Sequence, residues 1–552
     1  MSDPVQPLHA QARAWLADDP DPETRAELAD LLERAEDGVD ADSARAELAD
    51  RFAGLLQFGT AGLRGELGAG PNRMNRAVVI RAAAGLAAWV RAEGGGGVVV
   101  GYDARRNSDV FARDTCAVME GAGIEAMVLP RPLPTPLLAF AVRQLGADVG
   151  VMVTASHNPP NDNGYKVYLG DGSQLAPPAD TQIADRIASV PGVAAVPRAD
   201  DGWVTLDDSL LEAYLDRAVA VLDPNSARDL SVVYTPLHGV GRDLLLAAFT
   251  RAGFPAPSVV PEQGEPDPAF PTVTFPNPEE VGALDAALAQ ASAQGASLVV
   301  ANDPDADRCA VAVPGRDGGW RMLTGDEVGV LLGAHLIDRG AQGTFANSIV
   351  SSSLLGKIAG AAGVPHTETL TGFKWITKAP GLRFGYEEAL GYCCDPEAVK
   401  DKDGITAALL VAELAADLQQ QGRTLLDRLD DLARLHGLHL TSQVSVRVDD
   451  LDRIAAVMAR LRAEPPARLG GLDVQAAEDL LAPGGPLPPT DGLRYRLDGQ
   501  ARVVVRPSGT EPKVKCYLEV VEPVSGGDVE GARALAAQRM RTLREQMSTL
   551  LG

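Results

Sequence analysis

Short apolar runs alternate with longer mixed stretches along the chain from about residue 97 onwards. The runs predict buried strands at 97–102, 124–129 and 149–153, and helices are predicted between them at 108–121 and 136–145. Strands that alternate with helices imply a largely parallel sheet. Such a sheet places its ligands at the carboxyl ends of the strands.

The same alternation recurs in two later stretches, and the last part of the chain differs. Further strands are predicted at 230–234, 297–301 and 344–350, and further helices at 242–252, 284–294, 326–338, 351–362 and 405–420. The last part is predicted to hold strands at 442–448, 493–497 and 501–506, and helices at 451–464 and from 529 onwards. Three similar α/β blocks and one small α+β unit are therefore expected. That number suits 552 residues at about 150 per domain.

A helical extension is expected ahead of these blocks, because Asp21-Pro22 places a proline at a helix start. The predicted boundaries are 1–53 for the extension, 54–202, 203–315 and 316–435 for the α/β domains, and 436–552 for the last domain.

Composition narrows the class of protein. The net charge of -25 argues against a nucleic-acid partner, which needs a basic face, but allows a local basic pocket for an anionic substrate. No apolar run approaches about 18 residues, so no membrane span is expected. The acidic Met1–Asp50 does not resemble a signal peptide, and the odd count of five cysteines shows no CxxC spacing. A reducing cytoplasm is the expected location.

The first candidate for chemistry is Thr154-Ala155-Ser156-His157-Asn158-Pro159-Pro160, which follows the apolar run 149–153. A serine at the point where a buried strand breaks into a proline-stiffened loop is held in place, so Ser156 is a candidate nucleophile. A polar turn without chemistry is the alternative. We expect the adjacent Ser156 and His157 not to face each other. No G-x-S-x-G motif or acid partner is present, so a hydrolase pair is not predicted.

A second candidate is Asp303-x-Asp305-x-Asp307, which follows the predicted strand at 297–301. Carboxylates this close repel one another unless a cation intervenes, and Mg²⁺ suits carboxylate and phosphate oxygens together. An EF-hand is excluded, because Arg308 takes the place of its glycine and Pro314 that of its glutamate. A solvated acidic turn is the alternative.

Anion-binding groups gather near the end of the chain and in several loops. Arg506-Pro507-Ser508-Gly509-Thr510-x-x-Lys513 offers a guanidinium, hydroxyls, backbone donors and an ammonium for a phosphate. Two stretches rich in glycine and arginine, 58–65 and 101–106, are weaker candidates. We expect Lys166, Lys374, Lys400 and Lys402 to lie in loops, where each could position a phosphate or exchange a proton, or be an ordinary surface lysine. A held serine, a metal triad and a phosphate cradle together indicate phosphoryl transfer through a phosphoserine.

These motifs resemble the signature loops of the α-D-phosphohexomutase superfamily. The four are Thr154–Pro160, Asp303–Arg308, Gly385-Tyr386-Glu387-Glu388 and Arg506–Lys513, in the family's order. The stretch 58–65, with Asn72-Arg73-Met74-Asn75 and Asp401-Lys402-Asp403-Gly404, is most similar to the branch of phosphoglucomutase-2-type enzymes and phosphopentomutases.

The resemblance implies an α/β fold of four domains around a central cleft, with one signature loop from each domain. It implies catalytic roles for Ser156, Lys166, Arg64 and Lys402, and Mg²⁺ held by phosphorylated Ser156 with Asp303, Asp305 and Asp307. The substrate-binding residues that it implies are Arg105, His157, Arg308, Thr371, Gly372, Lys374, Glu387, Arg506, Ser508, Gly509, Thr510 and Lys513. Which lysine exchanges the proton stays open.

The activity that the resemblance implies is phosphoglucomutase, with glucose 1,6-bisphosphate as activator and intermediate. Two departures from the family pattern leave the sugar open: Ala389-Leu390-Gly391 replaces the usual Ser-Gly-His, and Phe373 stands where relatives often carry histidine. Pentose, mannose or glucosamine phosphates are alternatives, as are a phosphatase and a silent sugar-phosphate-binding protein. The expected partner is a phosphorylated monosaccharide, with no nucleic acid or membrane, and the protein is expected to be a monomer or homodimer.

Overall fold

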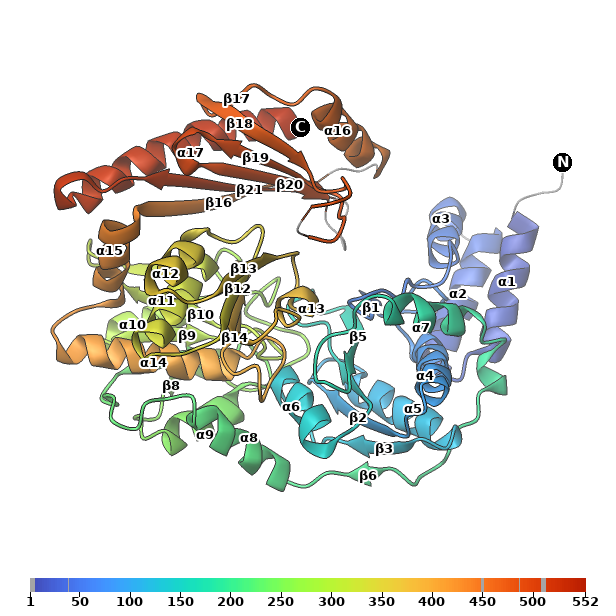
Figure 1. The fold of residues 1–552 in the computed structure, drawn as a ribbon. Helices are drawn as coiled ribbons and strands as arrows, with labels where there is room; N and C mark the ends of the chain where they lie inside the picture. The colour runs from blue at the N-terminus through green and yellow to red at the C-terminus, as the bar shows by residue number, and fades with distance from the viewer. Residues whose placement is uncertain (1–4, 38, 448–450, 486, 508–512) are drawn as a thin grey trace. The chain divides into compact units, whose positions relative to one another are not determined.

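The computed structural model describes residues 5–37, 39–447, 451–485, 487–507 and 513–552. By its contacts the chain divides into two compact units, Met1–Met322 with Cys393–Ala412, and Leu323–Tyr392 with Glu413–Gly552. Both combine helices with sheets (Figure 1), so the predicted α/β class is confirmed. No helix in the described ranges combines the length and apolar character needed to cross a membrane.

The first unit begins with the predicted helical extension. Its helices are α1 (Val5–Asp18), α2 (Pro22–Asp37) and α3 (Ala41–Arg51). They pack around Leu28, Leu31 and Leu48, which are fully or almost fully buried. Pro22 opens α2, as the proline at the first helical position predicts.

A six-stranded sheet with the order β1-β5-β4-β2-β3-β6 follows the extension. Its strands are β1 (Leu63–Glu66), β2 (Gly97–Tyr102), β3 (Glu125–Val128), β4 (Val149–Val153), β5 (Asp162–Leu169) and β6 (Val204–Thr205). Its helices are α4 (Arg76–Ala92), α5 (Ser108–Gly121), α6 (Thr135–Leu145) and α7 (Ala179–Ala188), with a short 3-10 turn at Val193–Ala195. The strands β2, β3, β4 and β6 pair in parallel, whereas β5 is antiparallel to both β4 and β1.

Strand β5 corrects the expectation that Lys166 lies in a loop. Asn163, normally a turn former, is fully buried here, and its amide donates to Arg106 O (2.9 Å) and Ser108 Oγ (3.0 Å). Side chains on both faces of β5 are buried, Tyr165 on one and Tyr168 on the other, so the alternation that marks a half-exposed strand is absent. Lys166 therefore lies in a sheet and not in a loop.

A five-stranded sheet with the order β11-β10-β9-β7-β8 completes the first unit. Its strands are β7 (Val232–Thr235), β8 (Ser258–Val259), β9 (Leu298–Ala301), β10 (Ala310–Pro314) and β11 (Trp320–Met322). Its helices are α8 (Ser209–Val219), α9 (Arg242–Arg251) and α10 (Asp285–Gln294), with a 3-10 turn at Pro261–Gln263. Because β9 and β10 are antiparallel neighbours, the acidic segment 302–309 forms the loop that joins them.

The second unit holds the other two sheets. The four-stranded sheet, in the order β13-β12-β14-β15, comprises β12 (Thr344–Ser348), β13 (His366–Thr369), β14 (Leu382–Glu387) and β15 (Gly391–Cys393). The associated helices are α11 (Gly325–Asp338), α12 (Leu354–Ala362), α13 (Phe373–Ile376) and α15 (Leu425–His436). Helix α14 (Gly404–Gln420) begins in the first unit, and its residues from Glu413 onwards belong to the second. Two residues expected in loops lie in regular elements instead: Glu387 ends β14, where the pairing of β14 with β12 extends as far as Tyr386, and Lys374 lies on α13.

The final sheet is six-stranded, in the order β16-β21-β20-β19-β18-β17. Its strands are β16 (Leu438–Arg447), β17 (Arg468–Leu469), β18 (Leu472–Asp479), β19 (Leu493–Leu497), β20 (Arg502–Pro507) and β21 (Lys513–Glu522). Its helices are α16 (Leu451–Ala463) and α17 (Val529–Leu551), with 3-10 turns at Asp498–Gln500 and Ser525–Gly527. These elements share one core, and this is the small α+β unit that the sequence predicts.

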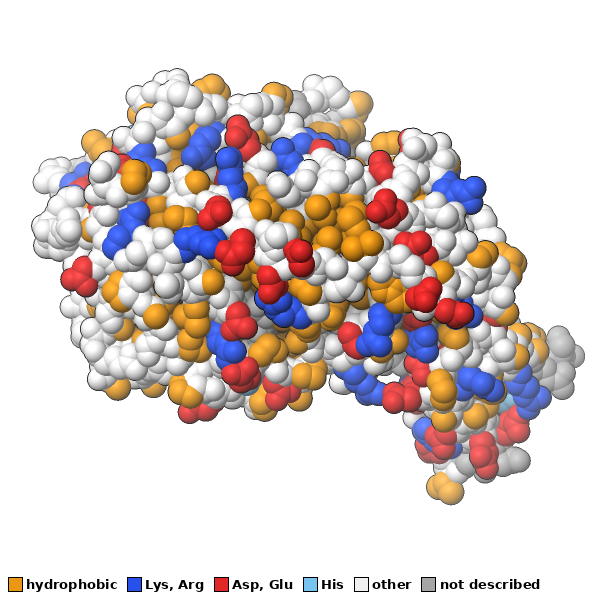
Figure 2. Space-filling model, turned by 90° about the horizontal axis from the view of Figure 1, so that it is seen from below, with side chains coloured by type: hydrophobic (Ala, Val, Ile, Leu, Met, Phe, Trp, Pro, Cys, Tyr) orange, Lys and Arg blue, Asp and Glu red, His pale blue; other side chains and the backbone are white. Residues whose placement is uncertain are grey.

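Charged side chains of both signs are interspersed on the face shown in Figure 2. On that face the Lys and Arg side chains lie beside Asp and Glu side chains, with hydrophobic side chains among them.

The domain boundaries expected from the sequence stay predictions.

Candidate active site

The Ser156 loop is held in a strained conformation by the strands on either side of it. Ser156 has a φ of 53°, in the left-handed region that a non-glycine residue rarely adopts. Its backbone N–H donates to Thr154 Oγ1 (2.9 Å), and the Thr154 hydroxyl donates to Asp103 Oδ2 (2.6 Å) at the end of β2. Non-glycine residues persist in this region where their surroundings over-determine them, and such positions cluster at functional sites.

Arg105 fixes the backbone of the same loop. Its guanidinium donates to the carbonyls of Ser156 (2.7 Å), Asn158 (2.6 Å), Pro159 (2.8 Å) and Asp162 (3.0 Å). The side chain is 1% exposed and also lies over the ring of Phe270, 4.9 Å from its centroid. These contacts suit a residue that positions the loop. A substrate contact for Arg105 stays a prediction.

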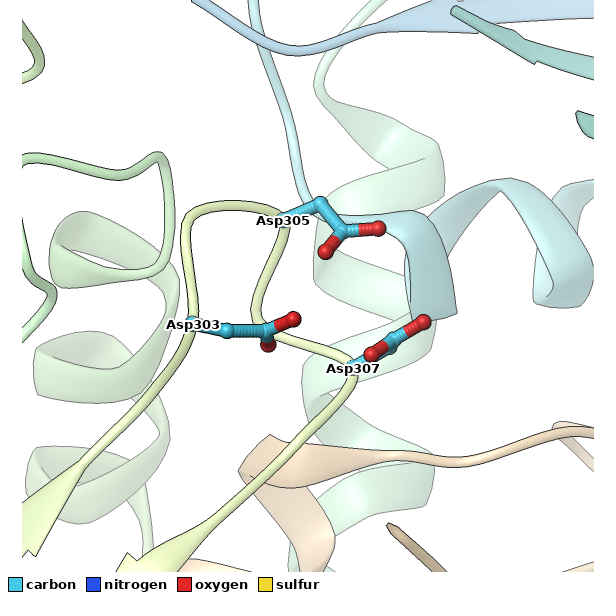
Figure 3. A group of neighbouring side chains, drawn as sticks. All are labelled: Asp303, Asp305 and Asp307. Atoms are coloured by element: carbon cyan, nitrogen blue, oxygen red, sulfur yellow. The ribbon is translucent and has the colours of Figure 1, made fainter. Parts of the chain in front are cut away.

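The three aspartates lie on the loop between β9 and β10, and their carboxylates point toward a shared space (Figure 3). One oxygen from each lies within 4.8 Å of the others, and all three residues are buried. Among the residues that the structure describes, Asp305 Oδ1 and Asp307 Oδ1 are buried without a hydrogen-bond partner. Unpaired buried oxygens are costly unless a ligand completes them, so this donor set fits a hard divalent cation.

Two lysines compensate part of the charge of the triad. Lys166 Nζ lies 2.6 Å from Asp305 Oδ2 and 3.1 Å from Asp307 Oδ2, and Lys402 Nζ lies 3.3 Å from Asp307 Oδ2. Burial and the neighbouring carboxylates raise the pKa of Asp303 well above its usual range. Burial would also raise the pKa of Asp305, but Lys166 outweighs it and the pKa is lowered. Asp303 is thus the member of the triad that is least stable as an anion.

The Ser156 side chain contacts the triad directly. Its hydroxyl donates to Asp303 Oδ2 at 2.6 Å. Ser156 Oγ is also 3.2 Å from His157 Nδ1, so the expectation that these adjacent side chains do not face each other is wrong. The left-handed conformation at Ser156 brings them together. Burial, with Arg308 and Arg64 nearby, lowers the pKa of His157 well below its usual value, which favours a neutral imidazole.

Arg64 and Arg308 bring positive charge to the Ser156 loop and the aspartate triad. Arg64, on β1, donates to Asn158 Oδ1 (3.0 Å), and Arg308 Nε lies 3.9 Å from Asp307 Oδ1. Burial and the charge of Arg308 lower the pKa of Arg64. Gly62 allows this approach of β1, because a Cβ there would lie 1.8 Å from Tyr165 O. A hydroxyl, a cation site and two guanidinium groups suit the gain and loss of a phosphoryl group.

The remaining candidate site residues that the structure describes lie in the second unit. Glu387 ends β14, and Thr371 and Gly372 lead into α13. Arg506 near the end of β20 and Lys513 at the start of β21 lie at the same end of the sheet, because these strands are antiparallel neighbours. Ser508, Gly509 and Thr510 lie outside the described residues.

The Tyr517 hydroxyl is influenced both by the glutamates at the end of β14 and by Arg506, and no motif in the sequence marks it. Burial raises the pKa of its hydroxyl, as do the charges of Glu388 and Glu387, while a hydrogen bond with Arg506 acts in the opposite direction. Glu388 accepts from Ser348 Oγ and Ser351 Oγ, both at 3.1 Å. The end of β14 and Arg506 are therefore electrostatic neighbours around Tyr517.

Two further residues were missed in the first unit. Thr135, at the start of α6, donates to Asp305 through its hydroxyl (Oδ2, 2.5 Å) and through its backbone N–H (carbonyl, 2.9 Å). Asp103 accepts from Thr154, from Ser108 Oγ (2.7 Å) and from the N–H of Arg105 (3.0 Å). No local motif marks either residue, and only the position of Asp103 directly after the strand 97–102 could have indicated it.

Four family models match the chain in succession. They are described as phosphoglucomutase/phosphomannomutase alpha/beta/alpha domain I (residues 55–191), domain II (212–318) and domain III (324–435), and the C-terminal domain (444–534).

Curated relatives and a solved structure agree with these matches. A Haemophilus influenzae protein named "Probable phosphomannomutase" is 48% identical, covering 81% of this chain and 93% of its own. A Homo sapiens protein named "Phosphopentomutase" is 34% identical, covering 89% of each chain. The crystal structure of a phosphoglucomutase/phosphomannomutase family protein from Burkholderia thailandensis has a TM-score of 0.70 at 20% identity, covering 89% of this chain and 97% of its own, a likeness that shows the fold.

Proposed function

The chain belongs to the α-D-phosphohexomutase superfamily, in its phosphoglucomutase-2/phosphopentomutase-like branch, and is a phosphosugar mutase, an intramolecular phosphotransferase; on this premise we propose that it interconverts glucose 1-phosphate and glucose 6-phosphate through a phosphate carried on Ser156. The observation that carries the proposal is the hydrogen bond from Ser156 Oγ to Asp303 Oδ2 at 2.6 Å, beside the other two carboxylates. A hydroxyl held beside a carboxylate cluster that suits a cation is placed to accept and to give up a phosphoryl group.

In the first transfer, the phosphoryl group leaves Ser156 for the free hydroxyl of a sugar monophosphate. The bond between Ser156 Oγ and phosphorus breaks, a bond from the sugar oxygen to phosphorus forms, and the proton of the sugar hydroxyl passes to the Ser156 oxygen. The bisphosphate then reorients within the site and transfers its other phosphoryl group to Ser156. The product is the isomeric monophosphate. Arg64 and Arg308 stabilise the charge that spreads over the phosphoryl oxygens.

Lys166 and Lys402 are the groups proposed to hold and move the proton. Burial would lower the pKa of Lys166, but Asp305 and Asp307 outweigh it, so the pKa is raised and Lys166 is protonated at neutral pH. Lys166 therefore suits the donation of a proton to the departing Ser156 oxygen. Lys402 lies on the same carboxylate, 3.3 Å from Asp307 Oδ2, and is the second candidate.

Asp303, Asp305 and Asp307, with phosphorylated Ser156, are proposed to hold Mg²⁺. Two of the buried carboxylate oxygens lack a hydrogen-bond partner in the part of the chain that the structure describes, and a cation would complete them. When bound, the ion would neutralise charge on the transferring phosphoryl group. Glucose 1,6-bisphosphate is proposed as the activator that first loads Ser156.

Residues of the second unit are proposed to recognise the rest of the substrate. Glu387 at the end of β14 would bind sugar hydroxyls, with Thr371, Gly372 and Lys374 beside the strand ends. The non-reacting phosphate would be bound by Arg506, Lys513 and the intervening Ser508, Gly509 and Thr510. In support, Arg506 and Lys513 lie at the same end of the antiparallel pair β20 and β21, which suits a shared anion.

A second candidate is a pentose phosphate substrate, which the relative named phosphopentomutase favours. The deciding experiment compares kcat/KM for glucose 1-phosphate and ribose 1-phosphate, with glucose 1,6-bisphosphate supplied in both assays. A higher value for glucose 1-phosphate is expected. A higher value for ribose 1-phosphate would replace the hexose assignment, and release of inorganic phosphate without isomer would overturn mutase activity in favour of a phosphatase.

A further inference from the structure

The segment Lys400–Gly404 belongs to domain III by sequence but to the first unit by its contacts. The family model for domain III matches residues 324–435, whereas the contacts of this segment group it with the Ser156 loop and the aspartate triad. Its Asp401, Lys402 and Asp403 side chains are all buried. A charged segment so placed needs partners for its carboxylates, and these partners determine where Lys402 lies.

Asp401 is held by two side chains of the first unit, Tyr168 on β5 and Gln174, which follows β5 and pairs with Tyr168 in an isolated bridge. Tyr168 OH, on β5, donates to Asp401 Oδ2 at 2.7 Å. Gln174 Nε2 donates to both carboxylate oxygens, at 3.0 Å and 2.9 Å. Tyr168 is fully buried, and burial with the charge of Asp401 raises the pKa of its hydroxyl well above the usual value, so it stays a donor.

Asp401 in turn fixes Lys402. The backbone N–H of Lys402 donates to Asp401 Oδ1 at 2.7 Å, and its Nζ lies 3.4 Å from the same oxygen. Nζ is thereby directed to Asp307, whose Oδ2 is 3.3 Å away. We propose that Tyr168 and Gln174 are positioning residues that place Lys402 at the reaction centre through Asp401.

The other end of the segment is anchored independently. Tyr214 OH donates to Asp403 (2.9 and 3.0 Å), and Asp403 accepts from the N–H groups of Ile405 (3.0 Å) and Thr406 (3.2 Å) in the first turn of α14. The N–H of Gly404 donates to Ala306 O in the aspartate loop at 3.2 Å. A Cβ at Gly404 would lie 2.3 Å from Arg308 O, so only glycine allows this approach. With this end fixed, the link between Tyr168 and Asp401 controls the orientation of Lys402 and not the docking of the whole segment.

The inference rests on the proposed function of Lys402 in the transfer. Its test is a double-mutant cycle of Tyr168→Phe and Lys402→Ala, measured by mutase turnover and by the single-turnover rate at which phosphorylated enzyme transfers its phosphoryl group. Tyr168→Phe should lower kcat by about 10-fold, the size expected for one lost hydrogen bond to a charged group, and leave KM unchanged. In the Lys402→Ala background the same change should have no further effect, because its target is already absent.

Gln174→Leu should behave like Tyr168→Phe in both backgrounds, because it removes the hydrogen bonds that the Gln174 amide donates to Asp401. Tyr495→Phe is the matched control, since it removes a buried tyrosine hydroxyl whose hydrogen bond, to Leu461 O at 3.3 Å, lies in the last domain. Its kcat should equal that of the wild type.

The proposal would be overturned if the double variant lost kcat by the product of the factors of the Tyr168→Phe and Lys402→Ala variants. A rise in KM with kcat unchanged in Tyr168→Phe would also overturn it. Failure of the proposed function is distinguishable, because the wild-type enzyme itself would then show no turnover of sugar monophosphates.

Discussion

Two clusters of buried carboxylates in this protein are compensated in different ways. In the first unit, Asp305 Oδ1 and Asp307 Oδ1 lack hydrogen-bond partners among the residues that the structure describes. In the second unit, Glu519 Oε1 accepts from Ser352 Oγ (2.7 Å) and the N–H of Ser353 (2.8 Å), and Glu519 Oε2, which also lacks a hydrogen bond, lies 2.9 Å from the guanidinium of Arg502. Burial would raise the pKa of Glu519, but Arg502 and His439 outweigh it and lower the pKa to about 2.

The difference separates a structural charge from a functional one. Glu519 is supplied with donors by its own chain, so its charge is stable without any ligand. In the triad, Lys166 and Lys402 lie beside Asp305 and Asp307, whereas burial and the neighbouring carboxylates raise the pKa of Asp303 and disfavour its charge. We therefore expect substitution at the triad to affect activity and substitution at Glu519 to affect stability.

The largest effect is expected from Asp303→Asn. Asparagine is similar in shape but cannot neutralise a cation, so kcat should fall at least about 1,000-fold. The free energy of unfolding without Mg²⁺ should not fall, and at neutral pH should rise, because the substitution removes a carboxylate charge that burial and the neighbouring carboxylates disfavour. Steady-state assays across a Mg²⁺ titration, with urea unfolding, measure both. Wild-type kcat at saturating Mg²⁺ would contradict the assignment of Asp303.

Glu519→Gln should show the opposite pattern. Loss of this charge leaves Arg502 with one carboxylate partner, Glu368, and should destabilise the second unit by roughly 3 kcal/mol. The kcat of the protein that remains folded should not change. Thermal unfolding and an assay at low temperature separate the two quantities. If the unfolding temperature is unchanged while kcat falls, the comparison between the two clusters is wrong.

Arg506→Ala tests a charged side chain that is assigned to substrate binding alone. KM should rise by about 10- to 100-fold with a smaller change in kcat, because a guanidinium that binds the non-reacting phosphate acts on ground state and transition state alike. Arg541→Ala, an exposed arginine on α17, is the control and should leave KM unchanged. An unchanged KM in Arg506→Ala would remove Arg506 from the phosphate site.

The smallest effect concerns Asp326, a buried carboxyl of the second unit whose pKa is raised to about 6, chiefly by burial. Because its pKa is higher in the folded protein than the ordinary value of 3.8, its contribution to stability is present below about pH 4 and is lost as the pH rises through 6. Asn can still accept from Ser352 N–H and Tyr386 OH. Asp326→Asn should therefore stabilise the protein by about 1–2 kcal/mol at pH 7.5 and by almost nothing at pH 4. A gain that is equal at both pH values would contradict the raised pKa.

Much of the fold was predictable because its central strands are short apolar runs. The strands Gly97–Tyr102 and Val149–Val153 and the helix Ser108–Gly121 match the predicted bounds. Strand β5 was missed because Asp162, Asn163 and Gly164 are turn formers by local propensity. Only the tertiary partners of Asn163, Arg106 O and Ser108 Oγ, allow a strand there.

The candidate site was predictable where several functional groups follow one another in sequence. Ser156 and the three aspartates are such runs, and the structure brings Ser156 and Asp303 into contact. The positioning contacts were not predictable, because each joins residues distant in sequence: Thr135 to Asp305, and Tyr168 to Asp401. No local pattern identifies a single threonine or tyrosine as the partner of a carboxylate more than a hundred residues away.

Mass spectrometry of the peptide that contains Ser156 tests whether this residue carries the phosphoryl group. After incubation with glucose 1,6-bisphosphate, the wild-type peptide should carry one phosphoryl group on Ser156. It should lose that group when excess sugar monophosphate is added, with bisphosphate appearing in solution. Ser156→Ala should show neither the modification nor turnover. A phosphoryl group on another residue, or full activity in Ser156→Ala with bisphosphate supplied, would contradict the account.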